Sequence, residues 1–248
     1  TDNDITEFYK LIDRALGDEL IFIADPILDP ISYGFTDSLV RYVNLREKYP
    51  DIHIMMGLGN ITELTHADTS GINMIMLGII EELKLNHILT TQVSRHCSTV
   101  IRETDLARRI IHAASENNLT PKHINDGLLV HHGHKDYAFC SDELIEMQGN
   151  IKDKNYRIYV NDDGIHLFNK NVYKIFSDPF DFYEHLEVSD DAGHAFYLGV
   201  ELARAQIAHQ LQKEYQQDEE LSWGCLVDKK VDNKLQSKEL GPTFKKRK

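Results

Sequence analysis

The stretch IHIMMGLGN, residues 52–60, decides the fold class that this sequence predicts. It begins as a short apolar strand and ends in two glycines and an asparagine. A helix with apolar residues at helical spacing is expected from Asp68 onward, because Asp68 is a natural N-cap. A strand that ends in a polar turn and leads to a helix is the repeating unit of parallel α/β sheets.

The same unit recurs on both sides of this stretch. Before it, the apolar run LIFIA at 20–24 predicts a buried strand, and a helix is expected over 36–48. After it, HILTT at 87–91 predicts a third strand and 103–117 a further helix. An amphipathic helix over 4–17 precedes all of them. In such sheets, ligands bind at the carboxyl ends of the strands, so the chemistry is expected in the loops that follow each strand.

The alternation stops beyond Leu119. Two strands around an Asp163-Gly164 turn predict a β-hairpin within 156–176, and 192–215 predicts a long helix. The expected organisation is an α/β region over 1–120, an α+β region over 121–227, and a flexible lysine-rich tail over 228–248.

Composition narrows the class of function. The 248 residues carry 27 Lys and Arg against 40 Asp and Glu, a formal net charge of -13. This acidity argues against general nucleic-acid binding and against docking on anionic membranes. No segment reaches the ~18 apolar residues of a membrane span, and the acidic N-terminus is not a secretory signal. Three widely spaced cysteines form no disulfide framework. The cytoplasm is therefore the expected compartment.

Two of the strand ends carry candidate ligand-binding residues. Asp25 can accept paired N–H donors of a heterocycle or stabilise a cation beside it, although these residues taken alone favour a strand-ending Asp-Pro turn. Gly57 and Gly59 allow a ligand close to the backbone, and Asn60 offers a donor and an acceptor to a pterin or purine edge. A glycine turn capped by Asn60 is the alternative. The stretch matches neither a dinucleotide fingerprint nor a Walker A loop.

Other clusters carry weaker signals. The HHGH run at 131–134 is expected to be a polar loop rather than a zinc site, because no recognised ligand spacing surrounds it. Arg95 is a candidate phosphate ligand. Cys97 lies beside two cationic groups, so it is either an activated thiol or part of an ordinary loop.

Residues 20–94 together resemble the pterin-binding family of dihydropteroate synthases and methyltetrahydropterin-dependent methyltransferases. LIFIADP resembles the family's sixth barrel strand, IMMGLGN its seventh and HILTTQVS its eighth. GLGNITELTHADTSGIN at 57–73 is most similar to the dihydropteroate synthase-like branch of tetrahydromethanopterin biosynthesis. Stretches 193–208 and 215–224 resemble that branch's carboxyl-terminal extension. With the chain beginning at Thr1, the resemblance implies the carboxyl-terminal portion of a longer TIM-barrel enzyme.

The resemblance also implies roles for individual residues. Asp25 matches the aspartate that grips the pterin ring, and we expect it to be the catalytic residue. Asn60 matches the asparagine that methyltransferase-type members direct at the pterin. Gly59-Asn60 replaces the Ser-Arg-Lys of ordinary synthases. The other residues that the resemblance assigns to substrate binding are Gly57, Gly59, Thr62, Glu63, Gln92, Ser94 and Arg95.

The implied reaction joins a dihydropterin-methyl diphosphate to an arylamine, a ribofuranosyl-aminobenzene phosphate. Mg²⁺ is expected with the diphosphate, a homo-oligomer is possible, and neither nucleic acid nor membrane is an expected partner. A methyltetrahydropterin-dependent methyltransferase and a non-catalytic pterin-binding or assembly subunit are the alternatives. This portion alone is expected to be inactive and poorly soluble, because a cut barrel exposes sheet edges.

Overall fold

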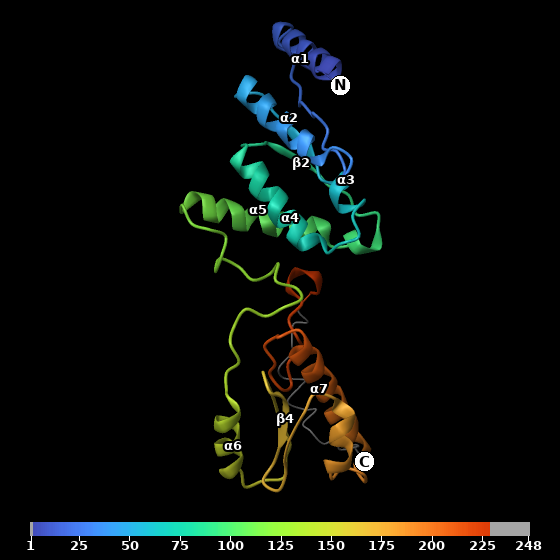
Figure 1. Ribbon diagram of the computed structural model, residues 1–248, viewed down its shortest axis with the longest axis vertical. Coiled ribbons are helices and arrows are strands. Elements are labelled where there is room, and N and C mark those ends of the chain that lie inside the picture. Colours follow the sequence, from blue (N-terminus) through green and yellow to red (C-terminus); the bar gives the residue numbers. More distant parts are fainter. Residues whose placement is uncertain (1, 229–248) are drawn as a thin grey trace, which may run out of the picture. The chain divides into compact units, whose positions relative to one another are not determined.

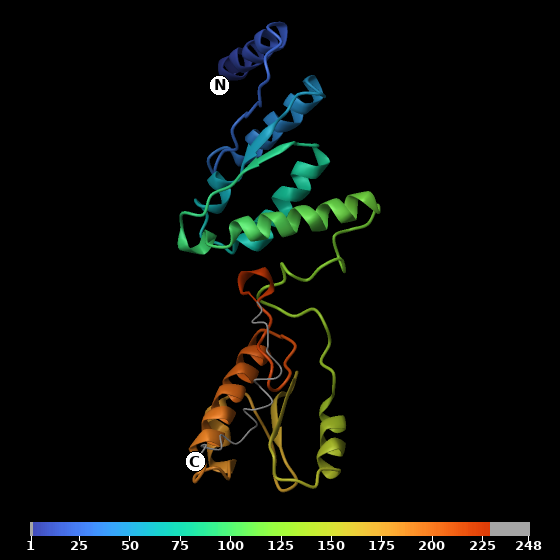
Figure 2. The same cartoon turned by 180° about the vertical axis from the view of Figure 1, so that it is seen from behind.

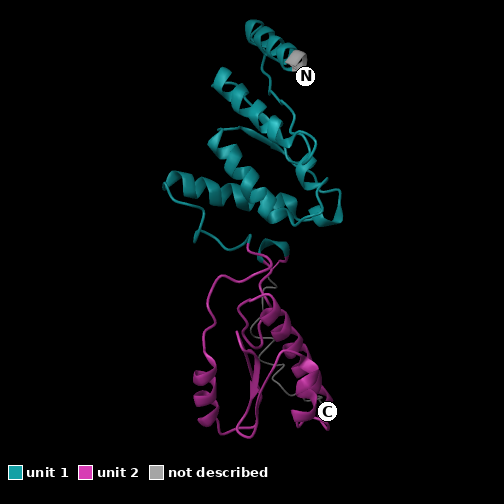
Figure 3. Cartoon of the chain, viewed as in Figure 1, with its two compact units in different colours: residues 1–128, 224–226 teal, residues 129–223, 227–248 magenta. Residues whose placement is uncertain are grey.

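The computed structural model describes residues 2–228, with side chains from Ile5 onward. The chain divides into two compact units, coloured separately in Figure 3. The first unit runs to Leu128 and includes Gly224–Leu226. The second unit runs from Leu129 to Trp223 and resumes at Val227. The lysine-rich tail expected over 228–248 lies outside the described residues apart from Asp228.

The first unit is an α/β structure in which β1 and β2 pair in parallel, with Met56 opposite Ile88. Helices α4 and α5 pack against each other (Figure 1). Its elements are α1 (Asp2–Gly17), α2 (Phe35–Lys48), β1 (Met55–Gly57), α3 (Gly59–Thr62), α4 (Thr69–Glu82), β2 (His87–Leu89), the 3-10 helix η1 (Arg95–Cys97), α5 (Val100–Glu116) and the 3-10 helix η3 (Gly224–Leu226).

The prediction of a buried strand over 20–24 is wrong. Only Ala24 joins β1: its N–H donates to the His53 carbonyl at 2.8 Å and its own carbonyl accepts from the Met55 N–H at 2.9 Å. The Ile21 side chain is fully exposed. This segment lies at the sheet edge, and no described strand pairs with its outer side, so Leu20, Ile21 and Ile23 remain exposed while Phe22 packs against the core.

The α/β class predicted from the sequence is confirmed for this unit, whereas the described residues contain a two-stranded parallel sheet and no closed barrel. Both strands are shorter than predicted. The core lies between the sheet and the helices that follow each strand. Its most deeply buried side chains include Tyr42, Leu45, Ile54, Met56, Leu58, Ile61, Met76 and Leu77.

A buried carboxylate joins α4 to α5. Glu103, in the first turn of α5, is only 1% exposed. It accepts hydrogen bonds from Thr69 Oγ1 at 2.6 Å, Asn73 Nδ2 at 2.9 Å and Thr99 Oγ1 at 2.7 Å. Since a buried charge needs partners, these three donors make the helix contact specific as well as apolar.

The second unit is an antiparallel sheet of order β3-β4-β5 with helices on either side of it in Figures 1 and 2. The predicted hairpin is confirmed, with Asn161 paired to Gly164 at its turn. Helix α7 contacts β3 and β4 and ends earlier than predicted. The elements are α6 (Ser141–Gly149), β3 (Arg157–Asn161), β4 (Gly164–Phe168), β5 (Tyr173–Phe176), the 3-10 helix η2 (Pro179–His185) and α7 (Ala192–Gln210).

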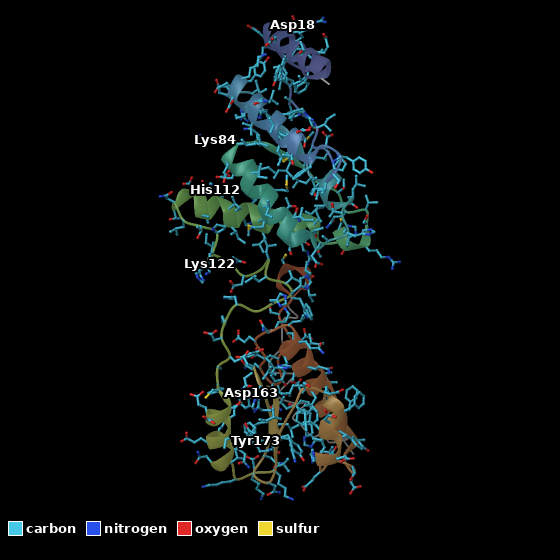
Figure 4. The ribbon with its side chains drawn as sticks, in the orientation of Figure 1. Asp18, Lys84, His112, Lys122, Asp163 and Tyr173 are labelled. Atoms are coloured by element: carbon cyan, nitrogen blue, oxygen red, sulfur yellow. The ribbon has the colours of Figure 1, made fainter. Side chains whose placement is uncertain are left out.

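Polar groups inside the second unit are paired. Buried His166 lies 2.9 Å from the Tyr173 hydroxyl through Nδ1 and 2.7 Å from Asn161 Oδ1 through Nε2. Burial lowers the pKa of His166. Asp163, labelled with Tyr173 in Figure 4, bonds the Ser141 hydroxyl at the start of α6. This network ties the hairpin to α6, and burial keeps the imidazole neutral at physiological pH.

A buried lysine joins the two chain segments that begin and end the second unit. Lys213 is 4% exposed, and its Nζ donates to the carbonyls of Val130 at 2.5 Å and Ser222 at 2.7 Å. The same Nζ lies 4.6 Å from the centroid of the Trp223 ring, a cation–π distance. The HHGH loop follows Val130 directly.

Among the described helices, none is both long and apolar enough to cross a membrane.

Candidate functional site

Three loops of the first unit meet at the carboxyl ends of its parallel strands. They follow Ala24, β1 and β2. The Leu58 N–H donates to the Leu89 carbonyl at 2.8 Å, which joins the second loop to the third. Asn60 Nδ2 donates to the Leu28 carbonyl at 2.7 Å, which joins the second loop to the first. The predicted residues of these three loops therefore lie at one edge of the sheet, as the βα pattern predicts.

Asp25 is fixed through one carboxylate oxygen. Its Oδ1 accepts from the Ile27 N–H at 2.9 Å and from the Tyr42 hydroxyl at 3.1 Å. Burial, with the Asp25 charge as a further cause, raises the pKa of Tyr42 far above its usual value, so this hydroxyl remains a donor. No hydrogen bond to Asp25 Oδ2 is formed by the described residues, and the side chain is half-buried. This oxygen is therefore available to accept from a ligand N–H.

The loop after Asp25 holds a strained residue. Ile27 has φ 63°, in the left-handed region that β-branched residues rarely occupy. Its N–H is held by Asp25, and its carbonyl accepts from Arg41 Nη2 at 2.7 Å. The same guanidinium nitrogen pairs with Asp29 Oδ2 at 2.7 Å. Arg41 carries no signal of this role in the sequence, because its partners lie 12 to 15 residues away along the chain.

The two glycines of the GLGN stretch differ in their surroundings. A Cβ at Gly59 would lie 3.0 Å from Thr91 Oγ1, so glycine there lets the loop after β2 pack closely on α3. A Cβ at Gly57 would meet nothing within 4 Å. Asn60 is exposed, and its amide nitrogen donates to the Leu28 carbonyl, while its amide oxygen has no hydrogen-bond partner among residues 5–228.

Glu63 holds the loop after β2 in place. Its Oε1 accepts from the Val93 N–H at 2.8 Å and from Thr91 Oγ1 at 3.1 Å, and its Oε2 accepts from the Ser94 N–H at 2.8 Å. These bonds, first of all the one from Val93, lower the pKa of Glu63 to about 2. Glu63 and Ser94 were selected as substrate ligands, and the structure gives both a positioning role within the loop.

Thr62 and Cys97 face the protein interior. The Thr62 hydroxyl donates to the Leu58 carbonyl at 3.2 Å, and Cys97 Sγ donates to the Thr62 carbonyl at 3.2 Å. Both residues are buried. Burial, then the Glu63 carboxylate, raises the pKa of Cys97 to about 11. Cys97 is therefore a protonated structural thiol, and of the two interpretations only the ordinary loop agrees with the structure.

The remaining selected residues are exposed at the same edge. Gln92 Nε2 donates to the Ser98 carbonyl at 2.8 Å. Arg95 begins η1 and is exposed, and its guanidinium has no hydrogen-bond or ion-pair partner among residues 5–228. A cation in this position suits an anionic ligand group. Within that range, no group of three His, Cys, Asp or Glu side chains could hold a metal ion, so these residues provide no built magnesium site.

The chain is similar in sequence to a known protein. The chain is 32% identical over 241 residues to an uncharacterized protein of Methanocaldococcus jannaschii. The similarity covers 86% of this chain and 44% of that protein, so the chain spans less than half of the relative's length. No family model and no solved structure matches the chain.

Proposed function

We propose that the first unit belongs to a pterin-binding transferase that resembles dihydropteroate synthase and acts in tetrahydromethanopterin biosynthesis. The observation that carries the proposal is the link between the two principal candidate residues. Asp25 begins the loop whose Leu28 carbonyl accepts from Asn60, so both side chains belong to one connected edge of the parallel sheet. A TIM barrel completed by further βα units of a longer chain is part of this proposal.

Asp25 has the geometry of a group that orients a heterocycle. Tyr42 and the Ile27 N–H hold Oδ1, and Oδ2 would accept an N–H of the pterin ring. The nearby carboxylate would also stabilise positive charge that develops when the leaving group departs. Asn60 would present its amide oxygen to a second ring N–H.

The reaction balances without a redox partner. The C–O bond between the pterin methylene and the diphosphate breaks, and the diphosphate takes the electron pair. The arylamine nitrogen attacks the same methylene, forms the C–N bond and loses one proton. Arg95 is the described cation placed to attract an anionic group, and Mg²⁺ would arrive as part of the diphosphate substrate.

Calorimetric titration with a dihydropterin-methyl diphosphate tests the proposal. We expect Asp25→Asn and Asn60→Ala each to weaken binding about tenfold or more, because each removes a hydrogen bond worth roughly 1–3 kcal/mol. Asp37→Asn, an exposed carboxylate at the start of α2, is the matched control and should bind normally. The pterin site would be contradicted if the folded wild type did not bind the pterin. It would also be contradicted if Asp37→Asn lost as much affinity as Asp25→Asn and Asn60→Ala.

The two alternatives give different results in the same system. A methyltransferase would bind a methyl-tetrahydropterin but no arylamine phosphate. A non-catalytic subunit would bind the pterin without any turnover. Turnover by the wild type that falls in Asp25→Asn even at saturating pterin would exclude the non-catalytic alternative and assign Asp25 to the chemical step.

A further inference from the structure

Arg41 connects helix α2 to the loop that follows Asp25. Its side chain is half-buried, with 30% of its surface exposed. Its Nε donates to the Pro26 carbonyl at 3.2 Å, and its Nη2 donates to the Ile27 carbonyl at 2.7 Å. Nη2 also pairs with Asp29 Oδ2 at 2.7 Å. One guanidinium therefore holds the loop at two backbone carbonyls and one carboxylate.

The contact with Pro26 acts on Asp25 through a single peptide group. The Pro26 carbonyl and the Ile27 N–H belong to the same planar unit, in which the two bonds point in opposite directions. Arg41 holds the carbonyl, and the N–H donates to Asp25 Oδ1 at 2.9 Å. A rotation of this unit would break both hydrogen bonds together. The guanidinium therefore fixes the donor that orients the Asp25 carboxylate.

The contact with Ile27 holds the strained residue of the loop. Ile27, at φ 63°, joins the peptide group before it to the one after it, and the carbonyls of both groups accept from Arg41. A residue in such an unfavourable conformation keeps it only where the surrounding structure holds it there. Hydrogen bonds from a charged donor are stronger than those between neutral groups. Arg41 therefore opposes a relaxation of Ile27 that would turn its N–H away from Asp25.

Two further side chains complete the restraint on this loop. Residues 25–30 lie in no helix or strand, so their backbone groups need other hydrogen-bond partners. Asn60 Nδ2 donates to the Leu28 carbonyl at 2.7 Å, so three consecutive carbonyls, at 26 to 28, accept from side chains. Buried Tyr42, which follows Arg41 in α2, donates to Asp25 Oδ1 at 3.1 Å. The loop is thereby held to α2 and to the GLGN stretch.

The charge of Arg41 is compensated within the loop. Its partner Asp29 lies close to the start of α2, where Gly34 is the N-cap residue at φ 105°. A Cβ at Gly34 would lie 3.2 Å from Asp29 Oδ2, so glycine leaves room for the carboxylate. A guanidinium that is already bound to a carboxylate and two carbonyls suits a structural restraint better than the capture of a ligand anion.

We propose that Arg41 is the positioning residue of the Asp25 carboxylate, an assignment that rests on the proposed function. Arg41 fixes the peptide group between residues 26 and 27, and this group and Tyr42 hold Oδ1, so Oδ2 keeps one direction toward a ring N–H. The role requires no contact between Arg41 and the substrate. Without it, ordering the carboxylate would oppose ligand binding, because a preorganised group loses less freedom when it binds.

Amide hydrogen exchange, followed by NMR in the full chain, tests the restraint without any ligand. We expect the Ile27 N–H to exchange about tenfold faster in Arg41→Gln than in the wild type, because its peptide group is free to rotate. Arg41→Lys keeps the charge beside Asp29 and loses the planar fork, so it should fold normally and change in the same direction. Arg109→Gln, which removes an Arg–Asp pair of equal 2.7 Å length on α5, is the matched control. Unchanged Ile27 exchange in these folded Arg41 variants would overturn the proposal.

Titration with a dihydropterin-methyl diphosphate then tests whether the restraint acts through Asp25. Arg41→Gln should weaken binding about tenfold in the wild-type background and by less than about twofold in an Asp25→Ala background. A merely structural role would weaken binding by the same factor in both backgrounds, which would overturn the proposal. A wild type that binds no pterin, with faster Ile27 exchange in Arg41→Gln, would contradict the proposed function and support the restraint on Asp25.

Discussion

Ile27 shows how a single backbone conformation can report strain beside a candidate site. The left-handed conformation costs a β-branched residue roughly 1–2 kcal/mol, whereas glycine adds about 0.5–1 kcal/mol of unfolded-state entropy. We therefore expect Ile27→Gly to stabilise the first unit by about 0.5–1 kcal/mol in urea unfolding. Ile31→Gly, at an exposed position outside the left-handed region, should destabilise it. Equal losses of unfolding free energy in Ile27→Gly and Ile31→Gly would show that the loop does not strain Ile27.

The lowered pKa of Glu63 predicts that the stability of the folded first unit depends on pH. Its pKa is about 2 in the folded chain against an ordinary 4.5, so its contribution is complete above 4.5 and is lost as the pH falls from 4.5 to 2. Glu63→Gln retains one acceptor oxygen where the carboxylate uses two. Thermal unfolding should therefore show a lower midpoint for Glu63→Gln at pH 7 and the same midpoint as wild type near pH 2. A difference that does not change with pH would exclude the carboxylate as its source.

Residues whose roles depend on nearby sequence could be predicted, and residues with distant partners could not. Asp25 and Asn60 follow apolar runs directly, so the sequence alone predicts their position at the strand ends. Arg41 and Lys213 are ordinary helix-terminal or interior cations in the sequence. Their roles come from carbonyls 14 and 83 residues away, which no local pattern contains.

At the scale of elements, the α4–α5 contact depends on Glu103. Glu103→Ala leaves the buried donors of Thr69 and Asn73 and the partly buried hydroxyl of Thr99 without their acceptor, which should cost about 1–3 kcal/mol of unfolding free energy. Glu116→Ala, at the exposed end of the same helix, should change it by less than about 0.5 kcal/mol. Chemical denaturation of both variants compares the two values. Similar small changes of unfolding free energy in Glu103→Ala and Glu116→Ala would mean that apolar packing alone holds α4 against α5.

The helices were easier to predict than the strands for a physical reason. Apolar spacing in a helix is satisfied by one packing surface, and the helices of the first unit form close to the predicted ranges. A continuously apolar strand needs neighbours and covering layers on both faces. The run at 20–24 has the composition of such a strand, but only Ala24 finds a neighbour within the described chain.

At the scale of the whole molecule, each unit has a core of its own. Lys213 holds Val130 and Ser222, near the two ends of the second unit, at the end of α7. We therefore expect residues 129–228, expressed alone, to unfold cooperatively. Trp223 is the single tryptophan of the chain, so its fluorescence reports on this region. Lys213→Met in the same fragment should shift that fluorescence, whereas Lys154→Met, at an exposed position, should not. Non-cooperative unfolding would mean that the second unit requires the rest of the chain.

The return of Gly224–Leu226 to the first unit has a consequence for how the protein is made. The Cys225 N–H donates to the Gly127 carbonyl at 2.7 Å, so the last piece of the first unit is joined to residues synthesised much earlier. At ribosomal rates of roughly 5–20 residues per second, the nascent first unit waits about 5–20 s while the whole second unit is translated. During that interval the surface of α5 and Gly127 that η3 later covers remains open to solvent, so the first unit reaches its final packing only after the second unit has been made.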